Sequence, residues 1–325
     1  MSSYDRFQTG PDDQGRRLDR IVRRLYPGLP LSVLYRMFRT GSIRLSGMKA
    51  KGADLIQPGD EITVRRPTGP GSVPCTPASE STPEPDLANE STPFFESLIL
   101  DRTPDLIIIN KPKGLLTHGP AGLDEIIAAY FSGKLPVSLS FRPAPLHRLD
   151  RNTSGALAVS ASIIGARTFS AALQAGLIGK EYLALLDGRL EHEIVLKDRL
   201  LRDGSRRTSS VADSGDGPLA ESRLVPLLTK KDHTLAAIRI TTGLTHQIRV
   251  QCARHGHPLT GDTKYGGSPL RGGYLLHCAC LEFPADLAAK APKTAAAPLP
   301  PAFRAVIQGI FDPKSLDSAA FQRYP

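Results

Sequence analysis

The segment HRLDRNTSG, at residues 147–155, places a carboxylate where it could do chemistry. Asp150 lies in a polar loop just before the apolar run GALAVS, and the turn residues Thr153 and Gly155 would lift the carboxylate off a sheet. A carboxylate is anionic at neutral pH and can bond to or stabilise an electron-poor sugar carbon, as in glycoside hydrolysis. A loop carboxylate is most often only solvated or a helix N-cap, so a catalytic role requires companion residues.

Three further segments supply candidate companions. They are NKPKGLLTH at 110–118, GKEYLALLDG at 179–188 and TGLTHQIRVQCARHGHPLTGD at 242–262. Together with HRLDRNTSG, in this order and at this spacing, they resemble the RluA family of pseudouridine synthases. HRLD alone would be weak support, whereas four segments in order make an accidental resemblance improbable.

The resemblance implies a reaction. Members of this family isomerise uridine to pseudouridine in RNA. The matching Asp150 would attack ribose C1′ or act as the base of a glycal route, after which uracil detaches, rotates and rejoins through C5. The sequence leaves nucleophile and base open. No metal or redox cofactor is implied.

The resemblance also assigns roles to three companions. Arg249, in THQIRV, matches the basic partner that keeps the catalytic carboxylate ionised, on a helix that we expect Thr245 to cap and Gly256 to end. Tyr182 matches the tyrosine that stacks on uracil and moves a proton late in the reaction. Arg148 matches the arginine that enters the space left by the flipped uridine. Without the resemblance they would be interpreted as a surface arginine, a strand tyrosine and an arginine holding its loop by a salt bridge.

One position departs from the resemblance. Leu244 stands in TGLTHQIR where members of the family usually have arginine. Losing this charge could alter a contact with an RNA phosphate. The residues expected to carry the chemistry are unchanged, so the departure concerns substrate preference.

Positive charge is concentrated near the N-terminus. Residues 15–66 hold twelve Lys or Arg and four acids, so this stretch carries +8 of the formal +9 of the chain. In RRLDRIVRRLY, apolar residues recur at helical spacing, which predicts a helix that buries one stripe and presents arginines elsewhere. The stripe consists of Leu18, Ile21, Val22 and Leu25. Such a surface favours a polyanionic partner.

A second helix is predicted from the N-cap Ser32 to Gly41, and the short strands IRLSG and GDEITV follow. Two basic helices followed by such strands resemble the S4 RNA-binding domain. With the catalytic segments, this points to the RluC and RluD branch, which modifies large-subunit (23S) ribosomal RNA. The alternative is a charged surface that only solubilises a small domain. The arginines expected to bind RNA are Arg16, Arg17, Arg20, Arg36, Arg39 and Arg44.

Composition divides the chain into two ordered regions. Residues 67–92 hold six prolines and no Lys or Arg, which is typical of a flexible linker. Beyond it, apolar runs such as DLIIIN and HTLAAIRIT are spaced irregularly by helical stretches such as DEIIAAYF and ARTFSAALQAG, which predicts an α+β domain with a mixed, largely antiparallel sheet. We expect a disordered N-terminus at 1–14, an S4-like domain at 15–66, the linker at 67–92, the catalytic domain at 93–313 and a C-terminal tail at 314–325.

Bulk composition narrows the class of protein. With 40% hydrophobic residues, no run of 18 apolar residues and no signal-peptide pattern at the start, the chain is expected to stay in the cytoplasm and off the membrane. The four cysteines form no CxxC pair and are expected to be reduced thiols rather than zinc ligands. We expect ribosomal RNA as the partner, no cofactor, no obligate protein partner and a monomer.

Two other classes of function compete with a synthase. One is a noncatalytic S4-type RNA-binding protein that acts in ribosome assembly, against which the intact Asp150, Tyr182 and Arg249 argue. The other is a hydrolase that acts through Asp150. Glycoside hydrolysis typically needs a second carboxylate as acid or base, and the segments offer no obvious partner.

Overall fold

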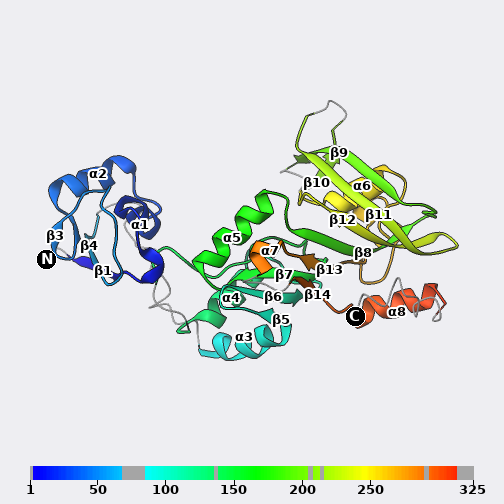
Figure 1. The fold of residues 1–325 in the computed structure, drawn as a ribbon, viewed down its shortest axis with the longest axis horizontal. Coiled ribbons are helices and arrows are strands. Elements are labelled where there is room, and N and C mark those ends of the chain that lie inside the picture. The colour runs from blue at the N-terminus through cyan, green and yellow to red at the C-terminus, as the bar shows by residue number, and fades with distance from the viewer. Residues whose placement is uncertain are drawn as a thin grey trace. The chain divides into compact units, whose positions relative to one another are not determined.

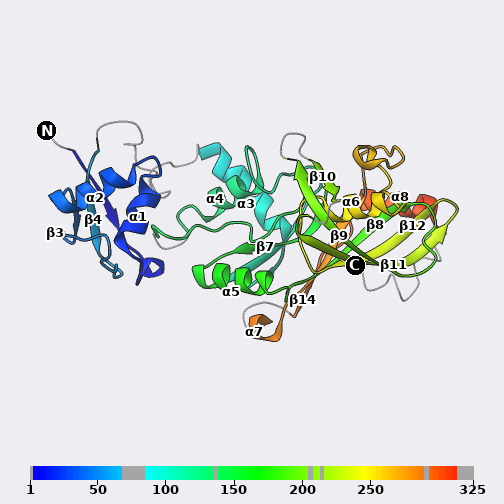
Figure 2. The ribbon, with the colours of Figure 1, turned by 90° about the horizontal axis from the view of Figure 1, so that it is seen from above.

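The protein is seen in a computed structural model that describes residues 3–67, 85–134, 138–203, 208–212, 216–288 and 293–312. The chain forms two compact units, each with its own sheet (Figures 1 and 2). The N-terminal unit comprises Met1–Phe95 and Ile126–Pro143. The second unit comprises Glu96–Glu125 and Ala144–Pro325 and is named the catalytic unit because it holds most of the region predicted to be catalytic.

The N-terminal unit contains a four-stranded antiparallel sheet in the order β1-β4-β2-β3. Its elements are β1 (Tyr4–Gln8), the 3-10 turn η1 (Pro11–Asp13), α1 (Leu18–Leu25), α2 (Leu31–Thr40), β2 (Ile43–Leu45), β3 (Met48–Lys49) and β4 (Glu61–Arg65). The predicted apolar stripe of α1 is confirmed, because all four of its residues are buried in one core with residues of α2 and of the sheet. Their spacing puts them on one face of the helix.

Helix α2 begins earlier than predicted. Its first residue is Leu31, its N-cap is Pro30, and no side chain caps it, so the prediction of Ser32 as N-cap is wrong. Proline with its fixed φ suits the residue that leads into a helix, and Ser32 is exposed in the first turn. The predicted end is confirmed, since Gly41 adopts φ 74° directly after the helix.

The prediction of a disordered stretch at 1–14 is wrong for residues 3–14. Strand β1 pairs with β4 along its whole length and buries Phe7 in the core. The Asp5 carboxylate accepts hydrogen bonds from Tyr26 Oη at 2.6 Å and from Arg66 Nε at 2.6 Å. A single buried aromatic and a buried ionic contact therefore order a segment whose composition is polar.

The linker and domain boundaries also differ from the prediction. Helix α3 (Pro85–Leu98) covers the last part of the predicted linker, while residues 68–84 lie outside the described residues. Residues 126–143, predicted to be catalytic, belong to the N-terminal unit. The Asp13 carboxylate accepts hydrogen bonds from Leu139 N at 3.0 Å and Ser140 N at 2.7 Å, and the Leu139 side chain enters that core. The predicted tail at 314–325 is outside the described residues.

The catalytic unit is built on a mixed, largely antiparallel sheet, as predicted. The strand order is β10-β9-β11-β12-β8-β13-β7-β6-β5, with β14 added beside β13, and only the β13–β7 pairing is parallel among the described strands. The strands are β5 (Ile99–Arg102), β6 (Leu106–Lys111), β7 (Ser154–Ser160), β8 (Gly179–Asp187), β9 (Ile194–Asp203), β10 (Thr208–Val211), β11 (Leu219–Lys230), β12 (His233–Ile240), β13 (Leu276–Glu282) and β14 (Thr294–Ala296). The remaining helices are α4 (Leu123–Phe131), which continues into the N-terminal unit, α5 (Ile163–Gln174), α6 (Gln247–Arg254), the 3-10 turn η2 (Thr263–Tyr265), α7 (Ala285–Ala288) and α8 (Pro301–Ile310).

The central strands explain the apolar runs in the sequence. Every residue of β7 is buried, as are Lys180–Leu186 of β8, because both faces of the sheet are covered there. Side chains of α8 pack with those of β8 and β12 in one core. Within the described residues, no helix is both long and apolar enough to cross a membrane.

Four neighbouring strands bring three of the four segments singled out in the sequence to one place. In the order β12-β8-β13-β7, β12 leads into α6, β8 carries Tyr182, β13 follows a long loop, and β7 is preceded by the loop that carries Asp150. Residues far apart in the chain therefore meet because their strands are hydrogen-bonded neighbours.

Candidate active site

Asp150 lies in the loop before β7, and hydrogen bonds fix this loop on both sides of it. Thr153 N donates to Asp150 O at 3.0 Å, which closes a turn. Thr117 Oγ1 donates to Leu149 O at 2.8 Å and accepts from Leu149 N at 3.2 Å. The Asp150 side chain is 17% exposed. It is therefore held near the surface of the unit, with access to solvent.

The segment NKPKG supports the same loop. The buried Lys111 ammonium donates to the carbonyls of Leu115 at 2.8 Å and Pro112 at 2.9 Å, and its third neighbour is Arg151 O at 3.4 Å. Gly114 N also donates to Arg151 O, at 2.8 Å. Burial lowers the pKa of Lys111 to about 8. This segment shapes the loop that presents Asp150.

His147 is a structural residue of that loop. Its Nε2 accepts a hydrogen bond from Ala158 N at 3.0 Å, and its ring stacks on Phe169. Burial lowers the pKa of His147 to about 3, so the ring is neutral. A neutral ring is what an accepting Nε2 requires.

Arg249 forms the predicted contact with Asp150 and a stronger contact that the sequence did not predict. Its Nη1 lies 3.3 Å from Asp150 Oδ2, while Nε and Nη2 bind the two oxygens of Asp262 at 2.6 and 2.8 Å. The Asp262 side chain is 2% exposed. Asp262 is the last residue of the segment TGLTHQIRVQCARHGHPLTGD. The sequence would have indicated its role only if Arg249 were known to be buried, because a buried arginine needs a carboxylate that binds two of its nitrogens.

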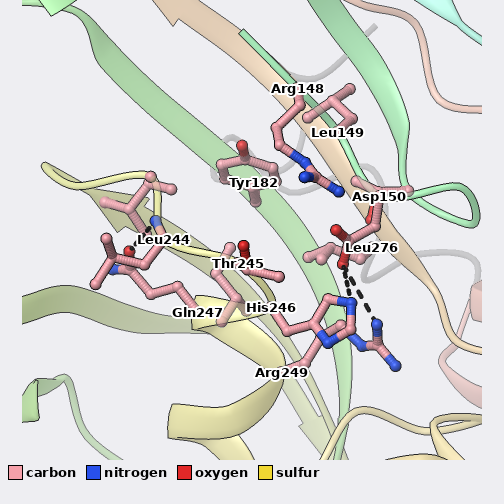
Figure 3. Close-up of a pocket in the computed structure, with 14 residues that line it drawn as sticks. Arg148, Leu149, Asp150, Tyr182, Leu244, Thr245, His246, Gln247, Arg249 and Leu276 are labelled. Carbon is pink, nitrogen blue, oxygen red and sulfur yellow. Dashed lines mark hydrogen bonds and ion pairs between the residues drawn. The ribbon is translucent and has the colours of Figure 1, made fainter. Parts of the chain in front are cut away.

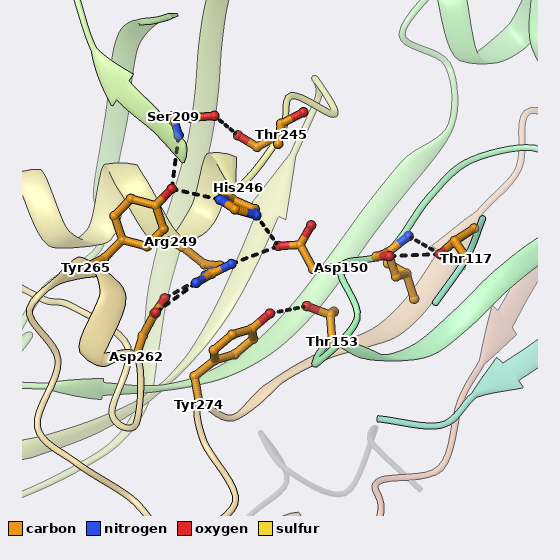
Figure 4. A network of polar contacts seen from close by, with 11 residues as sticks. Thr117, Asp150, Thr153, Ser209, Thr245, His246, Arg249, Asp262, Tyr265 and Tyr274 are labelled. Atoms are coloured by element: carbon orange, nitrogen blue, oxygen red, sulfur yellow. Dashed lines mark hydrogen bonds and ion pairs between the residues drawn. The ribbon is translucent and has the colours of Figure 1, made fainter. Parts of the chain in front are cut away.

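Two aromatic rings enclose the Arg249 guanidinium. Its central carbon lies 4.9 Å from the centre of the Tyr265 ring and 4.5 Å from that of Tyr274 (Figure 4). Burial alone would lower the pKa of Arg249, but the hydrogen bonds and charge of Asp262 raise it above its ordinary value. The guanidinium therefore stays charged and fixed in orientation beside Asp150.

The start of the helix that carries Arg249 differs from the prediction. Helix α6 begins at Gln247, and its N-cap is His246 with φ 55°, so Thr245 is not the cap. The Gln247 side chain instead accepts a hydrogen bond from Leu244 N at 3.1 Å. The predicted end holds to within a residue, because His255 is the C-cap and Gly256 follows at φ 82°.

His246 is a further polar residue that the sequence reasoning missed. Its Nε2 lies 3.7 Å from Asp150 Oδ2, and its Nδ1 lies 2.7 Å from Tyr265 Oη. The side chain is 14% exposed. Its position inside the motif THQIR was the only sequence signal, since a lone histidine has many structural uses.

Tyr182 and Arg148 line the same pocket as Asp150, as predicted (Figure 3). Tyr182 is 6% exposed on β8, and burial raises the pKa of its phenol well above the ordinary value. Arg148 is exposed and makes no hydrogen bond or ion pair with the part of the chain that the structure describes. The salt bridge considered for Arg148 is therefore not observed there.

The pocket is lined by both polar and apolar side chains. It encloses about 470 Å³ of empty space, including the part open to solvent. Asp150, His246 and Arg249 are among the polar lining residues, and Ile240 and Leu276 are among the apolar ones. A planar, polar-edged ring is the kind of group that fits such a pocket.

The six arginines predicted to bind RNA do not share one surface. Arg20, on α1, and Arg36 and Arg39, on α2, are exposed. Arg17 is ion-paired with Asp19 at 2.6 Å. Arg16 is half-buried, and Arg44 alternates with the buried Ile43 of β2, so it points to the sheet face opposite the core.

Metal and thiol chemistry find little support among the described residues. No three His, Cys, Asp or Glu side chains gather there as a metal site requires. Cys252, Cys278 and Cys280 are free, and Cys75 lies outside the described residues. Burial raises the pKa of Cys252 and Cys278 to about 12, so both are unreactive thiols.

Comparison with known proteins identifies the class first by fold. The solved structure titled human RNA pseudouridylate synthase domain containing 4 superposes with a TM-score of 0.57 at 18% identity, covering 68% of this chain and 96% of that one. The chain therefore has the pseudouridine synthase fold, which confirms the predicted α+β class.

Sequence comparison then identifies the family. The RNA pseudouridylate synthase family matches residues 105–254. Ribosomal large subunit pseudouridine synthase C of Haemophilus influenzae is 30% identical over 273 residues, covering 82% of this chain and 80% of the relative. The protein of the same name from Vibrio cholerae is 31% identical over 262 residues, covering 78% of each. The chain belongs to the RluA-type RNA pseudouridine synthases, as its four segments predicted.

Proposed function

We propose that this enzyme isomerises specific uridines in large-subunit ribosomal RNA, in the cytoplasm, with Asp150 as the essential carboxylate. The observation that carries the proposal is that Asp150 and Arg249 line one pocket, where Arg249 contacts Asp150 and is itself bound by the buried Asp262. The substrate class is supported by relatives named as ribosomal large subunit pseudouridine synthases. The monomeric state and the absence of an obligate protein partner stay predictions.

Asp150 begins the reaction at the ribose. In the nucleophilic route, a carboxylate oxygen bonds to C1′ while the bond from C1′ to uracil N1 breaks, and the electron pair stays on uracil. The free uracil turns, C5 bonds to C1′ as the carboxylate leaves, the proton on C5 is lost and N1 takes up a proton. In the alternative route, Asp150 removes the C2′ proton as the bond from C1′ to N1 breaks, which gives a glycal, and the proton returns to C2′ when C5 bonds to C1′. Substrate and product are isomers, so neither route consumes an oxidant or a second substrate.

Arg249 supports this chemistry by placing a fixed positive charge beside the carboxylate of Asp150. Its Nη1 lies 3.3 Å from Asp150 Oδ2. Because Asp262 holds two nitrogens of the guanidinium, the third points at Asp150 with little freedom. The cation is therefore pre-positioned before RNA binds.

Tyr182 and Arg148 bind the flipped nucleotide. Tyr182 provides a ring in the pocket wall on which uracil stacks, worth on the order of 1–3 kcal/mol. Taking a uridine out of its stack costs a few kcal/mol. The exposed guanidinium of Arg148, at the pocket rim, fills the vacated place and offsets part of that cost. The N-terminal unit supplies affinity for RNA through its exposed arginines.

The test is a map of pseudouridine in ribosomal RNA from a deletion strain. We expect specific large-subunit sites to lose pseudouridine, to regain it with the wild-type chain, and to stay unmodified with Asp150→Asn. The exposed Asp232 is the matched control, and Asp232→Asn should restore modification fully. An unchanged map in the deletion strain would disprove the substrate assignment. If Asp150→Asn restored modification, Asp150 would not be the essential carboxylate.

A noncatalytic assembly protein is the competing function. It predicts that Asp150→Asn rescues a defect in ribosome assembly as well as the wild type does. The buried charge arrangement around Asp150 favours the enzyme, since an RNA-binding scaffold has no need of it.

A further inference from the structure

The two oxygens of the Asp150 carboxylate have different surroundings. Arg249 Nη1 and His246 Nε2 both approach Oδ2, at 3.3 and 3.7 Å (Figure 4). No hydrogen bond or ion pair joins Oδ1 to the described residues. One oxygen is therefore held by the protein and the other is left for the pocket.

A chain of hydrogen bonds favours one position of the proton on the His246 ring. Ser209 N donates to Tyr265 Oη at 3.1 Å, and Tyr265 Oη lies 2.7 Å from His246 Nδ1. A phenol oxygen that accepts from a backbone N–H still has its own proton to donate. Given to Nδ1, this proton makes Nδ1 an acceptor, so the ring proton resides on Nε2, which faces Asp150.

The surroundings of His246 favour the neutral ring. Its negative neighbours are Asp150 and Asp262, and its positive neighbours are Arg249 and Lys264. Burial, the largest effect, lowers the pKa of His246, and the two cations add to it, while Asp150 raises the pKa. A second cation beside a permanently charged arginine is unfavourable. A neutral ring beside Asp150 is suited to donate a hydrogen bond and does not act as a counter-ion.

The backbone holds His246 in an uncommon conformation for this purpose. Its φ of 55° lies in the left-handed region, which costs a non-glycine residue free energy. Ser209 Oγ donates to Thr245 O at 2.7 Å, so strand β10 ties down the residue before it. Ser209 therefore restrains the backbone next to His246 and, through Tyr265, also favours one tautomer of its ring.

We propose that His246 is a positioning residue: Tyr265 fixes it in the Nε2–H tautomer, it holds Oδ2 of Asp150, and Oδ1 is the oxygen presented to the nucleotide. The inference rests on the proposed function, since it assigns the reacting oxygen of the carboxylate. At 3.7 Å the contact is longer than a hydrogen bond, and it shortens to one when RNA fills the pocket.

The first test reads the tautomer directly. Two-bond proton–nitrogen correlation spectra of the histidine rings distinguish protonation at Nε2 from protonation at Nδ1. We expect the Nε2–H form for His246 in the wild type and a mixture of forms, with a higher ring pKa, in Tyr265→Phe. The Nδ1–H form in the wild type, or an unchanged ring in Tyr265→Phe, would overturn the proposal.

The second test separates positioning from RNA binding. The side-chain amide of His246→Gln can replace the Nε2 donor, whereas His246→Leu cannot donate. We expect the single-turnover rate to fall roughly ten- to a hundredfold in His246→Leu, as the loss of a hydrogen bond to a charged group predicts, and to recover largely in His246→Gln. The dissociation constant for RNA should change less than twofold in both.

The outcomes distinguish this inference from the proposed function. Wild-type rates in His246→Leu, or equal losses in both variants, would refute the positioning role even if the enzyme modifies ribosomal RNA. A purely structural defect would weaken RNA binding and rate together in both variants. If the wild-type chain modifies no ribosomal RNA, the proposed function fails, while the ring spectra still decide whether Tyr265 fixes His246.

Discussion

Two sets of arginines, one in each unit, lie in opposite surroundings. In the N-terminal unit, Arg20, Arg36 and Arg39 are exposed to solvent on helices. In the catalytic unit, the Arg249 side chain is 8% exposed, is bound by Asp262 and is enclosed by two rings. Exposed charge attracts a polyanion over distance and is weakened by salt, whereas buried, paired charge is hardly screened.

This difference in surroundings suits the exposed arginines to RNA binding and the buried Arg249 to control of the reaction. Mobile surface arginines can neutralise phosphates of many RNA sequences, but they cannot orient a reacting group. A fixed guanidinium can orient the Asp150 carboxylate but is not available to the RNA backbone. Changes in one unit should therefore alter binding and salt dependence, and changes in the other should alter rate and stability.

Replacing Arg249 should have the largest effect. In Arg249→Met, we expect the single-turnover rate to fall roughly 10²–10³-fold, because Asp150 loses its pre-positioned cation. We also expect the free energy of unfolding to fall by about 3–5 kcal/mol, because Asp262 is left buried without a partner. Rapid-quench assays and urea unfolding measure the two quantities.

The exposed Arg254 lies on the same helix and is the matched control. Arg254→Met should change the unfolding free energy by less than about 0.5 kcal/mol and leave the rate unchanged. If Arg249→Met weakened RNA binding strongly but preserved the rate, the separation between the two units would be wrong.

Acid should weaken the catalytic unit before the N-terminal unit. All eight histidines are at His118 or later, and none belongs to the N-terminal unit. Burial lowers the pKa of His277 to about 4, so between pH 6.5 and 4 the unfolded chain binds a proton that the folded chain does not. Stability from this residue is present above pH 6.5 and is lost as pH falls. From pH 7 to 5 the loss is about 2 kcal/mol for each such histidine.

Hydrogen exchange at pH 7 and 5 would measure the loss in each unit. In His277→Gln the loss for the catalytic unit should shrink by about 2 kcal/mol, since glutamine does not titrate. His192 is exposed, and His192→Gln should leave the loss unchanged. Equal acid sensitivity of the two units would contradict the comparison.

Neutralising α2 should have a smaller effect, on binding alone. In Arg36→Gln with Arg39→Gln, we expect affinity for ribosomal RNA to fall roughly tenfold at physiological salt and the slope of log affinity against log salt to decrease by about 2. The rate at saturating RNA should stay the same. Arg223 is ion-paired with Glu193 at 2.8 Å, and Arg223→Gln should lower affinity much less. An unchanged salt slope in the double variant would show that α2 does not contact RNA.

The fold could be predicted where a pattern is local. The apolar stripe of α1 and the apolar run of β7 identified a helix and a strand, because burial of one face, or of both, leaves a periodic or continuous pattern. Strand β1 was missed because one buried Phe7 in a polar segment gives no such pattern. The N-terminal unit includes residues 126–143 because Asp13 binds their backbone, which no local pattern encodes.

The site could be predicted where a residue belongs to a motif. Asp150, Tyr182 and Arg249 meet in one pocket as expected. Asp262 and His246 were not predicted, although they stand in the same segments as residues that were. Their importance follows from contacts that the fold makes within and beyond these segments, and a sequence motif does not say which of its members touch.

The smallest expected effect is on the free energy of unfolding, at two serines near the starts of helices. In the catalytic unit, Ser162 Oγ accepts a hydrogen bond from Gly165 N at 3.0 Å and caps α5. In the N-terminal unit, Ser32 lies inside α2 and caps nothing. We expect Ser162→Ala to lower the free energy of unfolding by about 1 kcal/mol and Ser32→Ala to change it by less than about 0.5 kcal/mol, since alanine is the better helix former. Thermal unfolding of the two variants tests this difference. A loss near 1 kcal/mol in Ser32→Ala would indicate that Ser32 caps α2, as the sequence predicted, and would contradict the observed start of the helix at Leu31.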